Sequence, residues 1–241
     1  MMAPVLHATD PNMPDDVKLQ DHRTRVAAER RERMRKRLIE SAMVVFAKKG
    51  IGSSVIPDVV AAAEVSHGSF YNYFRTNDEL LLAVSDELSG EMVQLIAPAV
   101  DNIADPALRA ATGMRCYLHL ARSHRLLARF LAAAGLRVLG HQSAVFRYFP
   151  NDLEEGQQRG YFSQMMPIKI MLDVTAGVAL MAIDRMARSR TPKDYPDQMA
   201  TAVLRALGLA PAEIARVVAP ALPKLVPAAD SLLARTKDVD E

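Results

Sequence analysis

The chain has 241 residues, of which 50% are hydrophobic and 24% charged, and its formal net charge is +2. That much apolar material is enough for a sizeable core and argues against a disordered chain. The single cysteine, Cys116, excludes an intramolecular disulfide and a cysteine-based zinc site. Aromatic residues make up only 5%, while Ala, Leu, Val and Met dominate, which favours helices over a β-sandwich.

The N-terminus lacks the basic-then-apolar pattern of a signal peptide, since Asp10, Asp15 and Asp16 interrupt it. The most apolar late stretch, residues 170–183, contains Asp173 and is too short to span a bilayer. We therefore expect a cytoplasmic protein that has no membrane partner.

The charges are unevenly distributed. Nine basic residues against three acidic ones give the segment from Lys18 to Arg37 a local charge of +6. Such a block is typical of an arm that binds nucleic acid or an anionic membrane, although a solvated helix face gives the same pattern. Because three prolines precede it and no apolar periodicity accompanies it, we expect residues 1–28 to form a disordered basic tail.

Four helices are predicted in the first hundred residues. Apolar periodicity predicts a helix over about 30–49, with Gly50 at the position of a helix-ending glycine. Two short helices follow, over 55–63 and 66–74, with Ser54 and Ser66 as their N-caps. A longer helix starts at Asn77 and is expected to end before Pro98.

The remaining chain continues as helices at roughly 105–122, 124–139, 141–159, 166–188, 197–208 and 211–235, the last interrupted by prolines. No alternating segment is long enough for a sheet. The predicted fold class is all-α.

Two short helices joined by a tight turn within a three-helix bundle form a helix-turn-helix. In the second one, Phe70 and Phe74 are four residues apart and can pack inward, which leaves Ser69, Tyr71, Asn72 and Tyr73 to point outward. Hydroxyl and amide groups on a short exposed helix, close to a basic block, suit contacts to phosphates and base edges in a major groove.

The stretch from Arg37 to Leu82 resembles the TetR family of bacterial transcriptional regulators. The resemblance is carried by Phe-Ala-Lys-Lys-Gly (46–50), Asp-Val-Val-Ala-Ala-Ala (58–63), Gly-Ser-Phe-Tyr-Asn-Tyr-Phe (68–74) and Asn-Asp-Glu-Leu-Leu (77–81). It implies an N-terminal three-helix helix-turn-helix DNA-binding domain (29–75), a linking helix (76–97) and a C-terminal helical-bundle domain for effector binding and dimerisation (98–241). The expected contacts to double-stranded DNA are Arg37, Ser54, Ser66, His67, Gly68, Ser69, Tyr71, Asn72 and Tyr73.

Four positions depart from the family pattern. Glu64 stands where the family usually has a glycine, so we expect a turn conformation open to a residue with a Cβ. Pro57 stands where an arginine often reaches DNA. His67 and Asn77 replace lysines, which removes two fixed charges.

The resemblance also implies a homodimer. The helix at 166–188 carries one apolar stripe of Val174, Gly177, Val178 and Met181 and another of Leu172, Ala176, Ala179, Leu180 and Ile183. A helix that is apolar on two sides needs cover on both, so we expect the first stripe to face a second copy of the chain, assisted by the helix at 197–208. Complete burial inside one subunit is the alternative.

A run of arginines has no acidic residue near it in sequence. Arg115, Arg122 and Arg129 are seven residues apart and share one face if the helices around Ser123 are nearly continuous. Acidic groups from elsewhere in the dimer, DNA phosphates or an acidic ligand with an apolar tail, such as a fatty acid or acyl-CoA, could offset their charge. If an acidic ligand offsets the charge, we expect Arg115, Arg122 and Arg129 to line an effector pocket together with Met171 and Thr175.

No catalytic or metal-binding spacing is present, so we expect no cofactor, no metal and no enzymatic activity. The predicted function is a ligand-responsive DNA-binding regulator, a repressor released from a palindromic operator by a small, largely apolar effector. A DNA-binding activator or architectural protein without an effector is the alternative, and a helical enzyme with a basic arm is a remote one.

Overall fold

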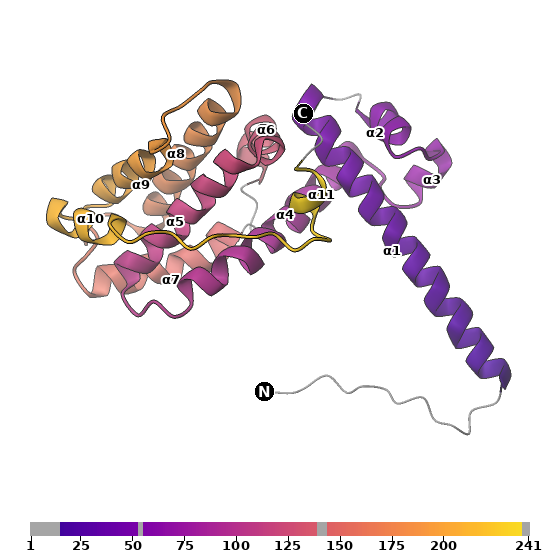
Figure 1. Ribbon diagram of the computed structural model, residues 1–241, viewed down its shortest axis with the longest axis horizontal. Coiled ribbons are helices and arrows are strands. Elements are labelled where there is room, and N and C mark those ends of the chain that lie inside the picture. The colour runs from indigo at the N-terminus through magenta and orange to yellow at the C-terminus, as the bar shows by residue number, and fades with distance from the viewer. Residues whose placement is uncertain (1–14, 53–54, 139–143, 238–241) are drawn as a thin grey trace.

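The computed structural model describes residues 15–52, 55–138 and 144–237, and they form eleven α-helices and one 3₁₀ turn, with no strand in this part of the chain. The all-α prediction is confirmed. A small head holds α1 (Asp15–Lys49), α2 (Ile56–Ala62) and α3 (His67–Tyr71), and α4 (Asn77–Val100) leads from it into the body. In Figure 1 the head and the body lie at opposite ends of the molecule.

The body contains α5 (Pro106–Ser123), α6 (Arg125–Ala134), the 3₁₀ turn Gly135–Val138, α7 (Ala144–Gln158), α8 (Ile168–Arg188), α9 (Tyr195–Ala206) and α10 (Pro211–Val218). An extended segment then crosses the body and ends in α11 (Leu232–Arg235), next to α4 (Figure 1). The interruption that the prolines predicted after α10 is therefore confirmed.

Helix α1 is much longer than its apolar pattern predicts. It begins at Asp15, so the prediction of disorder is wrong for residues 15–28, and residues 1–14 lie outside the described part. Residues 22–33 are exposed and strongly charged, which hides the helix from a search for apolar periodicity. The helix ends as predicted, because Gly50 has φ 82° and donates its amide to the carbonyl of Phe46.

Helix α4 also runs further than predicted, to Val100, with Pro98 inside its last turns. Its start at Asn77 is confirmed, and Thr76 acts as the N-cap by accepting a hydrogen bond from the Glu79 amide (3.0 Å).

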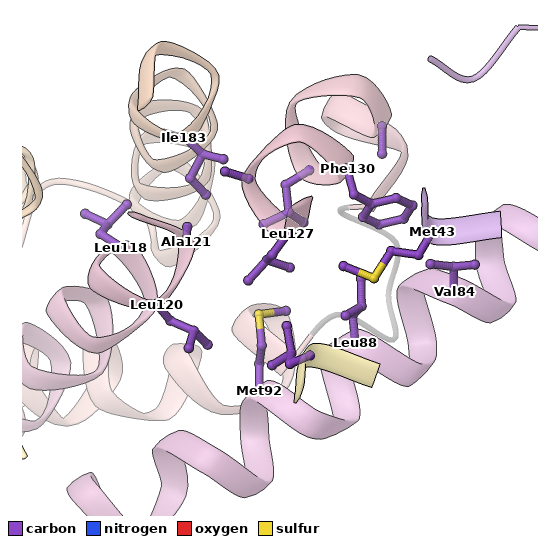
Figure 2. Packing of buried hydrophobic residues seen from close by; sticks show 14 of the residues in the cluster. Met43, Val84, Leu88, Met92, Leu118, Leu120, Ala121, Leu127, Phe130 and Ile183 are labelled. Carbon is purple, nitrogen blue, oxygen red and sulfur yellow. The ribbon is translucent and has the colours of Figure 1, made fainter. Parts of the chain in front are cut away.

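One continuous core joins the head to the body. The Phe130 side chain of α6 points towards Met43 of α1, with Leu88 of α4 beside them (Figure 2). The Phe130 ring lies 6.2 Å from the Phe46 ring, centroid to centroid, and both residues are fully buried. The head therefore rests on α4 and α6 and is not tethered by a flexible linker.

Candidate DNA-binding surface and effector cavity

The turn between α2 and α3 has the geometry that glycine usually provides. The Val65 amide donates to the Val60 carbonyl and the Glu64 amide to the Ala61 carbonyl (both 3.1 Å), and Glu64 has φ 51°. This is a Schellman motif with a left-handed residue at its end. The expectation of a turn conformation suited to a Cβ is therefore corrected, since Glu64 keeps the left-handed conformation that few residues other than glycine adopt.

Ser66 is the N-cap of α3. Its hydroxyl oxygen accepts the Ser69 amide (3.1 Å) and lies 3.0 Å from the Ser69 hydroxyl, so these two predicted DNA contacts also hold each other in place. Both remain at the start of α3, where backbone amides and hydroxyls can meet a phosphate.

The polar face of α3 points away from the protein. Phe70 and Phe74 are buried, as predicted, whereas His67, Gly68 and Asn72 are exposed and Tyr71 is 53% exposed. The Tyr71 ring stands edge-on to Phe70, with centroids 5.4 Å apart, which orients an exposed hydroxyl on a fixed ring.

The other predicted DNA contacts differ in their exposure and in their partners. Tyr73 is half-buried, with the Arg31 guanidinium 6.0 Å from its ring. Arg37 is exposed but already engaged in an ion pair with Glu64. Ser54 lies outside the described residues.

A cavity of about 490 Å³ lies between α4 and the body helices. Its wall is mostly apolar and comes from α4, α5, α6, α7 and α8, including Leu88, Met92, Met114, Phe130, Phe149 and Leu180. The volume and composition are those of a small-molecule site. Because α4 and Phe130 belong both to this wall and to the core beneath the head, a ligand here would touch the residues that position α1 and α3.

The polar end of the cavity is built around Arg109. Its guanidinium donates to Asp152 (2.6 Å), to Glu155 (2.5 Å) and to the Ile103 carbonyl (2.7 Å). Burial raises the pKa of Asp152 above its ordinary value although Arg109 donates to it. Arg109 is the only Lys or Arg among the described lining residues, and two carboxylates already neutralise it.

A buried phenol completes the polar lining. Burial raises the pKa of Tyr117 to about 12, so its hydroxyl is uncharged at neutral pH. Thr175, a predicted pocket residue, also lines the cavity, with its hydroxyl donating to the Met171 carbonyl (2.8 Å).

The other predicted pocket residues lie elsewhere. Arg115 is buried and donates to Asp197 (2.7 Å) and to the Pro220 carbonyl (2.9 Å), and Arg122 bonds to Thr191 and Pro192. Met171 is buried in the core, and Arg129 is also absent from the lining. Arg115 lines a separate cavity of about 400 Å³, and acceptors distant in the same chain occupy Arg115 and Arg122, so an effector pocket built from these arginines stays a prediction.

Arg115, Arg122 and Arg129 do not share one helix face, because the backbone changes direction at His124. His124 has φ −122° and ψ 89°, so α5 and α6 are separate helices and the seven-residue spacing does not continue across Ser123. Among the described arginines of α5 and α6, the one that lines the cavity is Arg109, whose partners are 43 and 46 residues away. Sequence spacing held no signal for that contact.

Helix α8 presents an uncovered apolar stripe. Met181 is 59% exposed and Gly177 is exposed, while Val174 and Val178 are half-buried. The opposite stripe faces the core, since Leu172, Ala176 and Ile183 are buried as predicted. Ile170 adds to the uncovered side, with 46% exposure.

Three further observations concern the described residues alone. No helix there is long and apolar enough to cross a membrane. No group of three or more His, Cys, Asp and Glu side chains there could hold a metal ion. Cys116 is buried, and burial raises the pKa of its thiol, in keeping with a packing role.

Residues 38–84 match the family model "Bacterial regulatory proteins, tetR family", and residues 105–220 match "Tetracyclin repressor-like, C-terminal domain". Among curated proteins, the chain is 32% identical over 76 residues to the HTH-type transcriptional repressor DhaR of Mycobacterium sp. (strain GP1). It is 30% identical over 74 residues to the repressor KstR2 of Rhodococcus jostii (strain RHA1). These alignments span 32% and 29% of this chain, but only 38% and 36% of the two relatives.

Solved structures extend the likeness to the body. RolR in complex with resorcinol superposes with a TM-score of 0.67 at 26% identity, over 83% of this chain and 100% of RolR. FadR of Bacillus subtilis in complex with stearoyl-CoA gives 0.57 at 18% identity, over 71% and 96%, and supports the fold alone. With two family models covering most of the head and body, the chain belongs to the TetR family of bacterial regulatory proteins.

Proposed function

We propose that the protein is a ligand-responsive transcriptional repressor that binds an operator through α3 and acts by binding rather than catalysis. The observation that carries this proposal is that α4 belongs both to the head and to the wall of the cavity. Its first turns pack in the head through Leu80 and Val84, and its middle lines the cavity through Leu88 and Met92. An effector that repositions the middle of α4 therefore changes where the two recognition helices of a dimer lie.

The geometry of DNA sets the sensitivity of such a switch. Recognition helices of a dimer must meet major grooves about 34–36 Å apart on a palindromic operator. An effector that prefers a different spacing lowers operator affinity by its differential binding free energy for the two states. The cavity supports a regulator with an effector over an architectural protein without one.

We propose that the dimer forms through the stripe of Val174, Gly177, Val178 and Met181, with α9 beside it. The exposed Met181 and the exposed backbone at Gly177 would be covered by the same residues of a second copy, as a two-fold interface requires. Val178→Glu should then produce monomers in analytical ultracentrifugation, whereas Lys169→Glu, on an exposed first turn of α8, should leave the dimer intact. A dimeric Val178→Glu protein would refute this interface.

We further propose that the effector is an uncharged, largely apolar molecule with hydroxyl groups. The described lining offers the Tyr117 phenol, two serine hydroxyls and the Arg109–Asp152 pair, but its one basic group is already neutralised. A carboxylate or a phosphate would enter without a free countercharge, which is costly in a largely apolar cavity. RolR, similar over most of this chain, was solved with resorcinol, a small phenol.

The test uses the purified full-length protein. A duplex is selected by it from random-sequence DNA, and release is titrated with resorcinol and related phenols in parallel with stearic acid and stearoyl-CoA. We expect release by an uncharged phenol at micromolar to millimolar concentration and none by the acidic lipids. Release by stearoyl-CoA alone would overturn the effector class, and failure to select any duplex would overturn the function.

The DNA-binding face has its own test. Tyr71→Ala should lower operator affinity at 0.15 M salt by about tenfold, since one charge-assisted phosphate contact contributes about 1.5 kcal/mol. Tyr71→Phe keeps the ring on Phe70 and removes only the hydroxyl, so it separates phosphate contact from helix packing. Equal affinity of Tyr71→Ala and the parent would remove Tyr71 from the interface.

A further inference from the structure

The first half of α1 extends beyond the rest of the head. In Figure 1 it projects past α2 and α3, away from the body. Residues 22–33 are all exposed, so no described part of the chain covers this helical extension. Apart from the contact of Arg31 with Tyr73, the exposed part of α1 gains little stabilisation from packing, and exposed helices without packing are marginal in water.

The charges on this extension are sorted by face. At about 100° per residue, Arg23, Arg30 and Arg37 recur every seven residues and fall within ~40° of one another. The neutral Ala27 and Met34 fill the space between them. We call Arg23, Arg30 and Arg37 the basic face.

The acidic residues occupy the other side of the helix. Glu29 and Glu32 lie roughly 100° and 160° around from Arg30. Arg25 belongs to that second side, since its guanidinium lies 3.9 Å from the Glu29 carboxylate and bonds to His22 (3.2 Å). Arg23 and Arg30 therefore lie away from Glu29 and Glu32, whereas Arg37 already pairs with Glu64 of the turn before α3.

The basic face is turned towards the recognition helix. The Arg31 guanidinium lies 6.0 Å from the ring of Tyr73, which follows α3, and Arg37 pairs with Glu64 in the turn before α3. Around the helix axis Arg30 lies between Arg31 and Arg37. These contacts fix the side of α1 that is closest to any DNA bound by α3. From Arg23 to Arg37 the helix rises ~21 Å, the length of about six base pairs.

We propose that the basic face of α1 is a second DNA-binding element, which lies along the phosphate backbone next to the groove that α3 enters. This inference rests on the proposed operator binding and extends it. A rigid helix presents its arginines at a fixed spacing and loses less conformational entropy on binding than a disordered arm does.

The test compares two double variants that each lose two positive charges per subunit. Arg23→Gln/Arg30→Gln alters the basic face, and Arg25→Gln/Lys36→Gln alters the opposite side; glutamine preserves helix propensity. On the selected duplex, the first should lower the slope of log affinity against log salt by about 3 to 4 for a dimer. The control should change it by less than about 1.

A second readout uses duplex length. Trimming the duplex to the palindrome should weaken the parent and the control but leave Arg23→Gln/Arg30→Gln unchanged, because its flanking contacts are already lost. Equal slopes for both double variants would overturn the proposal. Binding to vesicles that contain phosphatidylserine is measured in parallel, and a basic-face variant that loses vesicle binding but keeps DNA binding would also overturn it. If the parent binds the duplex while these variants match it, this inference alone fails; if the parent binds no duplex, operator binding fails with it.

Discussion

Arg37 of α1 and Glu64 of the turn form an ion pair across the head, with the Nη2 and Oε2 atoms 2.8 Å apart. Their side chains are 47% and 82% exposed, so the pair itself contributes at most about 1 kcal/mol to stability. The main effect of the pair is on the charge of the surface next to α3. A carboxylate sits at the turn that leads into the recognition helix and occupies an arginine that would otherwise meet a phosphate.

We predict that Glu64→Gly both stabilises the protein and tightens operator binding. Glycine relieves a left-handed conformation that costs about 1 kcal/mol with a Cβ, and the removed carboxylate releases Arg37. Thermal unfolding should shift upward by roughly 2–4 °C. Gel-shift titration at 0.15 M salt should show several-fold higher affinity.

Glu64→Asn is the matched control, because asparagine tolerates the left-handed region and carries no charge. It should reproduce the gain in affinity with a smaller gain in stability. A loss of affinity in both variants would show that Glu64 contributes positively to the DNA-binding surface.

The local features of the head were predictable because their causes are local. Gly50 ends α1, and Phe70 of α3 and Phe74 after it are buried, since each depends on residues within one or two helical turns. The start of α1 was missed for the same reason: its stability does not come from an apolar stripe. Glu64 was identified as unusual, but its φ value depends on the Schellman hydrogen bonds that only the folded turn contains.

The cavity could not be predicted in this way. Arg109 meets Asp152 and Glu155 across more than forty residues, and Arg115 meets Asp197 across 82. A run of arginines without nearby acids looks unbalanced in sequence, although folding supplies the partners. The apolar wall of the cavity was equally hidden, because a residue such as Phe130 shows the same helical pattern whether it faces a void or a packed core.

We predict that Phe130→Leu weakens the effector response more than it weakens DNA binding. Phe130 lines the cavity and contacts the Phe46 ring of α1, so it transmits changes at the wall to the head. Shortening the side chain should cost about 1–2 kcal/mol of stability and leave operator affinity within about threefold. The effector concentration for half-release should rise by about tenfold or more, as measured by fluorescence anisotropy of labelled operator.

Val217→Ala is the control for stability, since Val217 is fully buried in α10 and does not line the cavity. It should lower thermal stability by a similar amount and leave half-release unchanged. If both variants alter release equally, the effect reflects general destabilisation and the Phe46–Phe130 contact carries no coupling.

We predict that Asp197→Asn destabilises the body by about 2–4 kcal/mol, because it leaves Arg115 buried without its counter-ion. The Arg115 side chain is only 8% exposed, and the other Asp197 carboxylate oxygen bonds to His119 (3.1 Å). Urea unfolding monitored by circular dichroism measures the loss. The double variant Arg115→Met/Asp197→Leu should recover most of it, since apolar residues of similar volume replace a buried pair at little cost. A double variant as unstable as the single one would show that other contacts of Asp197 dominate.

The last prediction concerns the C-terminal segment and pH. Glu91 of α4 accepts the backbone amides of Leu232 and of Leu233 (3.0 Å) at the start of α11, whose Thr236 is buried against Met43 of α1. Burial is the largest influence on this carboxyl and raises its pKa above the ordinary 4.5, although both amides favour the charged form. The folded protein therefore binds the Glu91 proton more tightly than the unfolded chain does.

That difference fixes the sign of the pH dependence. The stability that Glu91 contributes is fully present below pH 4.5 and is lost as the pH rises through the raised value. The free energy of unfolding of the parent, relative to Glu91→Gln, should thus decline between pH 4.5 and pH 7, as measured by urea titrations at several pH values. In a chain that ends at Val226, which lacks α11, the same comparison should be flat because Glu91 is then exposed to water. Parallel curves in the full-length pair, or a difference that grows with pH, would show that the two backbone amides outweigh burial at this site.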